Sequence, residues 1–227
     1  MLPYYVSPDQ MMQEKGDYAR KGIARGKSVV VAEYDSGYII MAENRSTALN
    51  KISEIYDRIA FAGVGKFSEF EYLRKEGIRF ADVKGYNYSR DDVQAKSLAN
   101  AFSSVMGQVF TSEIKPLEAE ILVVEVGDDS SGDSIYHISF DGTITDYYQY
   151  VVMGGQVERI RAFLSEEYKE GLGFKDAFML CKRALEIPYG DGLKLDPSQL
   201  EVAKMERNGL GRRFRRVPKE QVREMTG

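Results

Sequence analysis

The order of strand-like and helix-like runs is the strongest constraint on the fold of this chain. Spacing of the apolar residues predicts one helix, four strands, two helices, a second block of strands, two helices and a final strand pair. Strands that follow one another through short turns pair antiparallel, whereas a doubly wound parallel sheet needs strands and helices that alternate singly. The order therefore predicts an α+β fold, a four-layer α-β-β-α sandwich with an extra N-terminal helix.

Turn and cap residues place the ends of these elements. Ser7-Pro8-Asp9-Gln10 has a capping Ser, a Pro suited to the first helical turn and a Gln that closes a capping box, so a helix is predicted over 8–25. Its apolar residues are loosely spaced, and we expect it to pack on something outside its own domain. The predicted strands cover residues 27–34, 38–43, 51–55, 58–65, 118–126, 134–140, 143 onward, 200–207 and 212–217. The other predicted helices cover residues 67–80, a segment from Asp91 or Asp92 to Phe110, 157–168 and 174–185.

Composition excludes several classes of function. The 227 residues, 43% hydrophobic and 29% charged, have the balance of a globular domain. One cysteine, Cys181, and one histidine, His137, leave almost nothing for a disulfide, a His-rich metal site or a Ser-His-Asp triad. We expect Cys181 to be buried in a helix and His137 to lie on a strand surface. No catalytic, metal-binding or cofactor-binding residue is predicted.

Targeting signals are also missing from the sequence. The first 20 residues include Gln, Glu, Lys and Asp where a signal peptide needs an apolar segment. No apolar run approaches the ~20 residues that cross a bilayer. We therefore expect a cytoplasmic protein.

Charge is distributed unevenly along the chain. The net charge of −4 argues against a general nucleic-acid binder, although the segment from Lys204 to the end carries an excess of +5. The run from Arg212 to Arg216, RRFRR, has the charge to bind phosphate backbones but only one aromatic residue. We therefore favour a solvated strand and tail, which pairs with the acidic surface of a neighbouring chain. A nucleic-acid module is the less favoured alternative.

The run Ala62-Gly63-Val64-Gly65-Lys66 looks like the end of a phosphate-binding loop. Such a loop needs a Gly five residues before the Gly of the Gly-Lys pair and a Ser or Thr after the Lys. These positions hold Ala60 and Phe67. Nucleotide binding is therefore not expected, and the glycines better suit a strand end that passes close to another backbone.

A sandwich of this kind is able to carry a nucleophile at its own amino terminus. A Thr, Ser or Cys at the head of the first strand then acts with its α-amino group as base. This chain has Gly26-Lys27-Ser28 there, after a capped helix that does not resemble a disposable propeptide. An amino-terminal-nucleophile hydrolase exposed by processing at Ser28 stays open as the alternative function.

Several segments of the sequence resemble one family. They read SPDQMMQEKGDYARKGIARGKSVVVAEYDSG, AENRS, NKISEIYDRIAFAGVGKFSEFEYLRKEGIRFAD, YVVMGG and FRRV. In this order, over essentially the whole chain, they are similar to the α-type subunit of the bacterial (actinobacterial) proteasome core particle. The resemblance implies one proteasome α-type domain with the amino-terminal-nucleophile hydrolase fold. It divides into a gate segment (1–7), an N-terminal helix (8–25), a sandwich (26–217) and a C-terminal tail (218–227).

The resemblance also implies a subunit without catalysis. In such particles α-type subunits form heptameric outer rings, and β-type subunits with an amino-terminal threonine form the inner rings. Gly26 falls where a β-type subunit has that threonine, and Lys51 where it has its catalytic lysine. In α-type subunits this lysine lines a pocket between neighbours, where it meets the terminal carboxylate of an activator's tail. The implied docking pocket comprises Lys51, Gly26, Gly65 and Lys66, with room and backbone N–H groups at the glycines.

The start of the chain resembles the gate of that family. Copies of this apolar segment meet at the ring axis and close it, and the implied gate residues are Leu2, Pro3, Tyr4, Tyr5, Val6, Ser7, Pro8 and Tyr18. The Tyr-Asp-Arg turn of archaeal and eukaryotic relatives is missing, so their opening mechanism is not carried over. Implied partners are β subunits, further copies of the chain, unfolded protein substrates, and two activators that dock by C-terminal tails: a hexameric proteasomal ATPase and an ATP-independent ring. No nucleic-acid or membrane partner is implied.

Overall fold

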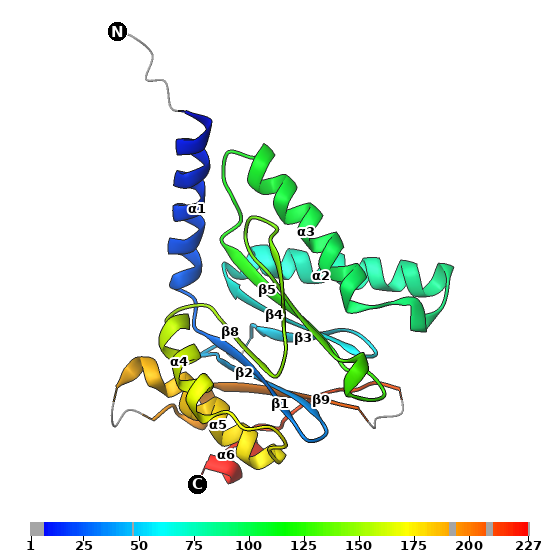
Figure 1. Cartoon of the computed structure of the whole chain (residues 1–227), viewed down its shortest axis with the longest axis vertical. Coiled ribbons are helices and arrows are strands. Elements are labelled where there is room, and N and C mark those ends of the chain that lie inside the picture. Colours follow the sequence, from blue (N-terminus) through cyan, green and yellow to red (C-terminus); the bar gives the residue numbers. More distant parts are fainter. Residues whose placement is uncertain (1–6, 47, 191–193, 208–210, 227) are drawn as a thin grey trace.

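Two five-stranded antiparallel sheets form the centre of the molecule (Figure 1). The computed structural model describes residues 7–46, 48–190, 194–207 and 211–226. One sheet has the order β10-β9-β2-β1-β8 and the other the order β3-β4-β5-β6-β7. The strands are β1 (Val29–Tyr34), β2 (Gly37–Glu43), β3 (Ile52–Tyr56), β4 (Ile59–Gly65), β5 (Ala119–Glu125), β6 (Ser134–Ile138), β7 (Ile144–Tyr147), β8 (Tyr150–Met153), β9 (Leu200–Glu206) and β10 (Phe214–Arg216).

Helices cover the outer face of each sheet. Helices α2 and α3 pack on the sheet that contains β4, and α4 and α5 pack on the sheet that contains β1 (Figure 1). The helices are α1 (Pro8–Ala24), α2 (Phe67–Asn87), α3 (Ala95–Ser112), α4 (Val157–Glu167), α5 (Phe174–Glu186) and α6 (Lys219–Thr226), with short 3-10 turns at Arg90–Asp92, Ser130–Gly132, Ile187–Tyr189 and Pro197–Gln199. This is the four-layer α-β-β-α sandwich that the sequence predicts.

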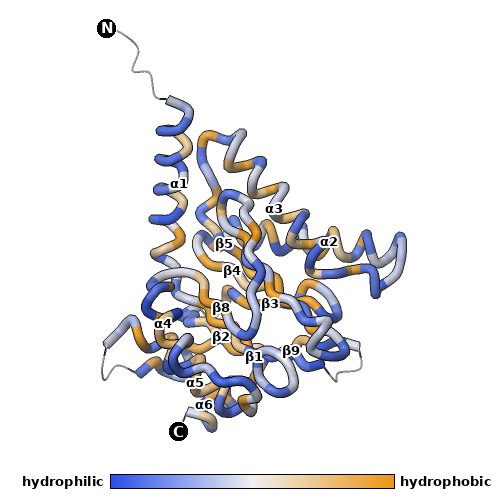
Figure 2. Tube along the Cα trace, in the orientation of Figure 1, coloured by the Kyte–Doolittle hydropathy of each residue, from blue (hydrophilic) through white to orange (hydrophobic). Residues whose placement is uncertain are grey.

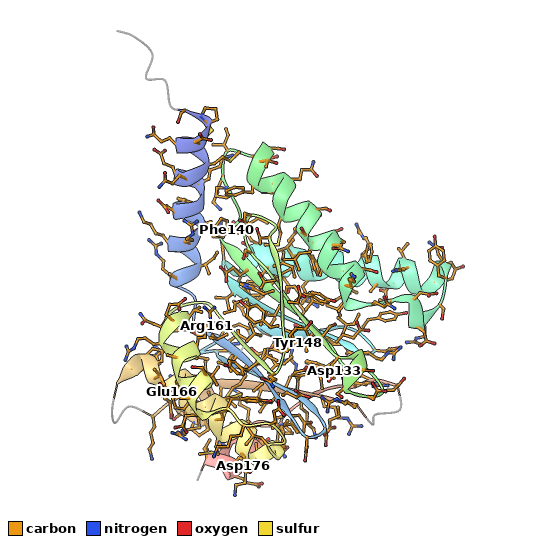
Figure 3. All side chains as sticks on the ribbon, in the orientation of Figure 1. Asp133, Phe140, Tyr148, Arg161, Glu166 and Asp176 are labelled. Atoms are coloured by element: carbon orange, nitrogen blue, oxygen red, sulfur yellow. The ribbon has the colours of Figure 1, made fainter. Side chains whose placement is uncertain are left out.

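Both faces of the central strands are buried, which accounts for their nearly continuous apolar sequences. Successive side chains of a strand point to opposite faces. In β1, Val29 and Val31 pack between the sheets, whereas Val30 and Ala32 pack under α5. In β4, Phe61 packs under α2 and α3 in the same way. The central strands are accordingly hydrophobic along their length in Figure 2, and side chains fill the space between the layers in Figure 3.

Helix α1 stands at the edge of the sandwich and belongs to it only in part. Ser7 caps it and Pro8 is its first residue, as predicted. Ala19 and Ile23, in its second half, are buried in the core between the sheets. The second half thus packs within the domain, whereas the first half extends beyond the sandwich (Figure 1). Packing of the helix on something outside its own domain stays a prediction.

Two helix boundaries differ from the prediction. Helix α2 continues to Asn87, beyond the apolar spacing that ends at Ile78. Asp91 does not cap α3, because the 3-10 turn Arg90–Asp92 contains it. The carboxylate of Glu125 on β5 instead accepts the Ala95 N–H at the start of α3 (2.8 Å). A cap supplied from another element leaves no local signal in the sequence.

Two other segments also differ from the sequence-based reading. The chain leaves one sheet after β7 and joins the other as β8, turning at Gln149, which has φ +66°. The segment after residue 217, expected as a C-terminal tail, forms α6 with Val222 buried. The predicted turn at Asn208-Gly209 lies outside the described residues. None of the described helices is long and apolar enough to cross a membrane.

Replacement of Gly37 by Ala is expected to destabilise the β1–β2 hairpin. Gly37 has φ +153°, and a Cβ there would overlap the Met205 carbonyl oxygen of β9. Gly171, with φ +73° and nothing within 4 Å of an added Cβ, provides the control for backbone conformation alone. We expect Gly37→Ala to lower the free energy of unfolding by about 3 kcal/mol and Gly171→Ala by about 1 kcal/mol, measured by urea denaturation. Equal losses would contradict the steric explanation.

Candidate functional site

Lys51 lies in the bend that leads into β3, and its side chain reaches the start of β1. Its ammonium donates a hydrogen bond to the Lys27 carbonyl oxygen (2.6 Å). Its backbone N–H donates to Glu201 on β9 (2.9 Å), and the Ile52 N–H donates to the other oxygen of that carboxylate (3.1 Å). Both ends of Lys51 are thus fixed by residues of the neighbouring sheet.

Burial dominates the electrostatics of Lys51. It lowers the pKa of the ammonium from the usual 10.5 to about 8; Glu43 and Glu201 oppose this shift and Lys27 adds to it. Those carboxylates pair with other cations, Glu43 with Lys27 and Glu201 with Arg216. Within the described part of the chain, no carboxylate lies within 4.0 Å of the Lys51 ammonium. The site therefore holds a partly desolvated cation with only a neutral acceptor.

Gly26 and Gly65 lie against one another where α1 ends and β4 ends. A Cβ on Gly26 would lie 2.6 Å from a Val64 methyl group and 3.0 Å from the Gly65 nitrogen. Gly65 has φ +105°, and a Cβ there would overlap the Glu118 carbonyl oxygen. The predicted close approach of this strand end to another backbone is confirmed at Gly65. The resemblance also implies that Gly26 and Gly65 leave room for a ligand, but neighbouring atoms of the chain already favour glycine at both positions.

Lys66 is the N-cap residue of α2, and its polar groups are engaged within the chain. Its ammonium lies 3.3 Å from Glu69, and its backbone N–H donates to the Glu118 carbonyl oxygen (2.8 Å). Burial opposes ionisation of Glu69, but hydrogen bonds from Lys115, the Glu118 backbone and Lys66 hold the pKa of that carboxyl below its usual value. The Lys66 N–H is therefore engaged within the chain.

A polar cavity of 260 Å³ lies beside Gly26 and was not predicted. Tyr189 donates to the Glu43 carboxylate and accepts from the Lys27 ammonium, which lies 3.5 Å from Glu43. These three side chains come from the start of β1, the end of β2 and the turn after α5. No spacing in the sequence links them. The only local signal is the charge of Glu43 at the end of an apolar strand.

The predicted gate residues fall into two groups. Leu2, Pro3, Tyr4, Tyr5 and Val6 lie outside the described residues. Ser7 accepts the Gln10 N–H on its side chain (3.2 Å), and the hydroxyl of the half-exposed Tyr18 donates to Glu118 (3.3 Å). Pro8 and Tyr18 are separated by about 15 Å along the helix axis, so they do not meet within one chain.

Other residues singled out from sequence have structural partners. Cys181 is buried in α5, as predicted, and burial raises the pKa of its thiol. His137 lies on β6, 3.1 Å from Glu120. Ser28 is 7% exposed, and its hydroxyl donates to the Gly155 carbonyl oxygen.

The RRFRR run is less solvated than expected. Arg213 is buried, with contacts to the Gly127 carbonyl and Asp128. Arg212 pairs with Glu54 at 2.5 Å, and Arg216 pairs with Glu201 at 2.8 Å. The expectation of a fully solvated strand is wrong for Arg213, because acidic and carbonyl groups of the same chain engage most of the cluster.

Comparison with known proteins agrees with this architecture of two antiparallel sheets between helix pairs. The family model described as "Proteasome subunit" matches residues 23–205, and the chain belongs to the proteasome subunit family, in its α type. It is 49% identical over 224 residues to "Proteasome subunit alpha" of Thermomonospora curvata, covering 99% of this chain and 97% of the relative. It is 53% identical to the protein of that name from Streptosporangium roseum (95% and 83% covered) and 48% identical to that from Kineococcus radiotolerans (95% and 93% covered).

The lowered pKa of Lys51 predicts how the free energy of unfolding changes with pH. Between pH 8 and 10.5 the unfolded chain keeps a proton that the folded chain has lost, so the free energy of unfolding should rise with pH. Lys51→Met lacks this contribution. We expect the stability difference between wild type and Lys51→Met to change in favour of wild type by up to about 1 kcal/mol per pH unit across this range.

Urea titrations at a series of pH values measure this difference. Lys75→Met, at an exposed position of α2, is the matched control and should run parallel to wild type. Parallel profiles for wild type and Lys51→Met would contradict the assigned shift.

Proposed function

We propose that this chain forms the heptameric outer rings of a bacterial proteasome core, gates substrate entry and docks ring activators through the site around Lys51. Its relatives carry the name "Proteasome subunit alpha", which supports a multisubunit core with β subunits. Under this proposal it acts in the cytoplasm on unfolded proteins delivered by a hexameric ATPase or an ATP-independent ring.

The observation that carries the proposal is the partly desolvated ammonium of Lys51, which has no carboxylate within 4.0 Å among the described residues. A C-terminal tail brings one carboxylate, and a charge-assisted contact to that ammonium replaces a hydrogen bond to the neutral Lys27 carbonyl. Under this proposal Lys66 forms part of the wall of the site, as the resemblance implies. Its charge pairs with Glu69 and its N–H with Glu118, so it does not donate to a tail.

Helix α1 supplies a connection between docking and gating. Its last turn leads directly to Gly26 at the docking site, and its first turn begins after the gate segment. Its 17 residues span about 25 Å, since an α-helix rises 1.5 Å per residue. Tyr18 also binds Glu118, whose carbonyl oxygen contacts the Gly65–Lys66 junction. A shift of Gly26 or Gly65 on tail binding is therefore transmitted along a rigid helix to residues 1–7.

Packing supports a non-catalytic subunit over a hydrolase processed at Ser28. Cleavage there would remove α1, and with it Ala19 and Ile23 from the core between the sheets. The Ser28 hydroxyl donates to a backbone carbonyl and is buried, so it is not placed to attack a substrate. Hydrolysis is accordingly assigned to the β subunits.

Replacement of Lys51 tests the docking proposal. We expect Lys51→Ala to assemble with β subunits and to cleave small peptides at the wild-type rate, but to lose activator-stimulated protein degradation by at least about tenfold, because a charge-assisted contact is worth over 1.4 kcal/mol. Lys75→Ala serves as the control. Unchanged activator binding by Lys51→Ala would contradict the assignment of the pocket.

Deletion of Leu2 to Val6 tests the gating proposal. The assembled particle lacking these residues should cleave small peptides faster than wild type without any activator, because the apolar plug is gone. Fluorogenic peptide hydrolysis measures the basal rate, and electron microscopy of the deleted particle confirms that four stacked rings still form. A basal rate equal to that of wild type would mean that the gate lies elsewhere in the chain.

A further inference from the structure

Lys27 joins the polar cavity beside Gly26 to the candidate docking site. Its carbonyl oxygen accepts the hydrogen bond of the Lys51 ammonium (2.6 Å), whereas its side chain lines the cavity of 260 Å³. Lys51 is not among the described residues that line this cavity. A side chain held in the cavity therefore belongs to the same residue that supplies the acceptor for Lys51.

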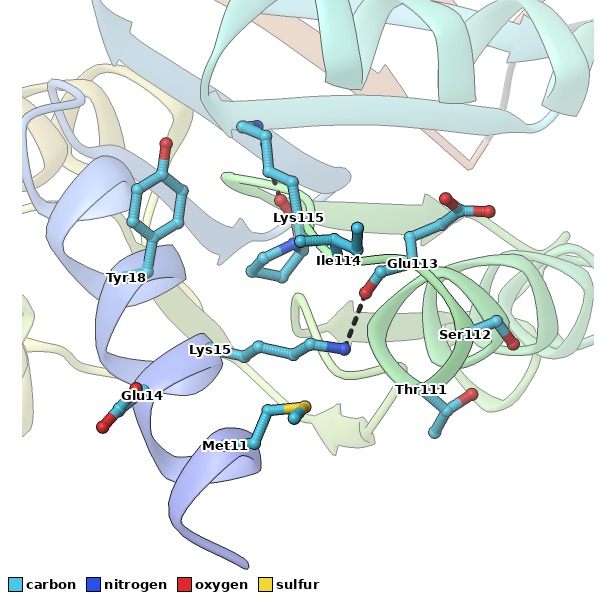
Figure 4. Close-up of a pocket in the computed structure, with 10 residues that line it drawn as sticks. Met11, Glu14, Lys15, Tyr18, Thr111, Ser112, Glu113, Ile114 and Lys115 are labelled. Atoms are coloured by element: carbon cyan, nitrogen blue, oxygen red, sulfur yellow. Dashed lines mark hydrogen bonds between the residues drawn. The ribbon is translucent and has the colours of Figure 1, made fainter. Parts of the chain in front are cut away.

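The main chain that leads into Lys27 is held in place. The Gly26 N–H donates to a carbonyl oxygen in the last turn of α1 (2.8 Å), and the Gly26 carbonyl oxygen accepts the Gly155 N–H (3.2 Å). The Lys15 ammonium ties the first half of α1 to carbonyl oxygens at the end of α3 (Figure 4). The position of the Lys27 carbonyl is thus set by the backbone, and its side chain is the part that the cavity must hold.

A tyrosine hydroxyl and a buried carboxylate hold the Lys27 ammonium in the cavity. The ammonium donates to the Tyr189 hydroxyl, lies 4.8 Å from the centre of that ring and is 3.5 Å from Glu43. Tyr189 in turn donates to Glu43, which is 3% exposed and also pairs with Arg45 at 3.2 Å. These contacts fix where the two charges lie, because a buried carboxylate that moved away from its partners would be desolvated and unpaired.

Three charged groups from three elements act on the Lys51 ammonium. Burial lowers the pKa of this group most; Glu43 at the end of β2 and Glu201 on β9 raise it, and Lys27 before β1 lowers it further. Glu201 is held separately, by Arg216 (2.8 Å) and by the Lys51 backbone N–H (2.9 Å). The cavity therefore positions two of the three charges that act on Lys51.

We infer that Glu43, Lys27 and Tyr189 form a tuning cluster for the docking site. The Tyr189 hydroxyl holds the carboxylate and the ammonium of the cluster in place, and their two charges set the pH above which the docking site loses its cation. Tyr189 acts through the other two side chains and is a positioning residue. The consequence for activator docking rests on the proposed function, whereas the effect of the cluster on the charge of Lys51 does not.

Competitive acetylation of the assembled particle measures the charge of Lys51 without any activator. Only the neutral amine reacts with trace acetic anhydride, so the yield of acetylated Lys51 at each pH, read by mass spectrometry, gives the titration midpoint of this lysine. We expect a midpoint at about pH 8 in the wild type. Glu43→Gln should lower the midpoint by about one pH unit, and Lys27→Met should raise it by a similar amount.

Opposite displacements by the two variants distinguish an effect of charge from an effect of altered packing. Glu71→Gln and Lys75→Met remove one charge of each sign from α2 and should leave the midpoint at its wild-type value. Unchanged midpoints in Glu43→Gln and Lys27→Met, or displacements of the same sign, would overturn the inference.

Replacement of Tyr189 by Phe tests the positioning role. The half-exposed Lys27 side chain loses its hydrogen-bond acceptor in this variant and extends into solvent, where its charge is screened. Lys27→Met should therefore displace the Lys51 midpoint by no more than about half as much in the Tyr189→Phe background as in the wild type. Equal displacements in the two backgrounds would refute the positioning role of Tyr189.

A functional arm separates the cluster from the docking proposal. The ratio of activator-stimulated protein degradation to basal peptide cleavage is measured against pH, with the ATP-independent ring as the activator. This ratio should fall about one pH unit earlier in Glu43→Gln than in the wild type, and about one pH unit later in Lys27→Met. If the acetylation midpoints move but the three degradation profiles coincide, the tuning of Lys51 is supported and the docking proposal is contradicted.

Discussion

The burial of both faces of the central strands is the constraint on which the rest of the structure depends. The apolar side chains of β1, β2, β4 and β5, inward and outward, enter one of three apolar cores, and the strands' glutamates lie at or next to the strand ends. A polar or charged side chain in the middle of such a strand would be desolvated without a partner. Functional groups are therefore confined to strand ends and to the segments that join them. Lys51 precedes β3, Lys27 precedes β1 and Glu43 ends β2, so the candidate site forms where these three strand ends meet.

The same constraint explains what sequence reasoning was able to predict. Strand blocks, their antiparallel pairing and the turn at Gly37 follow from local spacing and turn chemistry, and the structure has them. The Glu125 cap of α3 and the transfer of β8 to the other sheet depend on contacts between distant segments. For the site, the resemblance pointed to Lys51, Gly26, Gly65 and Lys66. The cluster of Lys27, Glu43 and Tyr189 beside them was missed, because its members are scattered along the chain.

Helix α1 packs on the sandwich with its second half and projects from it with its first half. Its second half must pack, and Gly16, Ala19 and Ile23 give it a narrow buried stripe. Its first half carries apolar residues that the sandwich does not cover, and Lys15 ties this half to the end of α3 by two hydrogen bonds to carbonyl oxygens. The helix therefore projects without fraying, since its cap and this tether satisfy groups at both contacting helix ends. A projecting yet rigid element is what a transmitted displacement requires.

Under the proposed function, the buried charge of Lys51 favours a carboxylate that binds and leaves over a permanent partner. A folded-state pKa near 8 means that the folded chain holds this proton less tightly than the unfolded chain, so the buried ammonium costs stability at neutral pH. A resident carboxylate would remove that cost but would also occupy the site. Glu43 and Glu201 lie close enough to moderate the shift, yet each pairs with another cation, and the Lys27 carbonyl accepts the only side-chain hydrogen bond of Lys51 among the described residues. Under the proposed function, an incoming carboxylate offsets the free-energy cost of the buried Lys51 ammonium. Binding is then strongest at pH values where the ammonium keeps its proton.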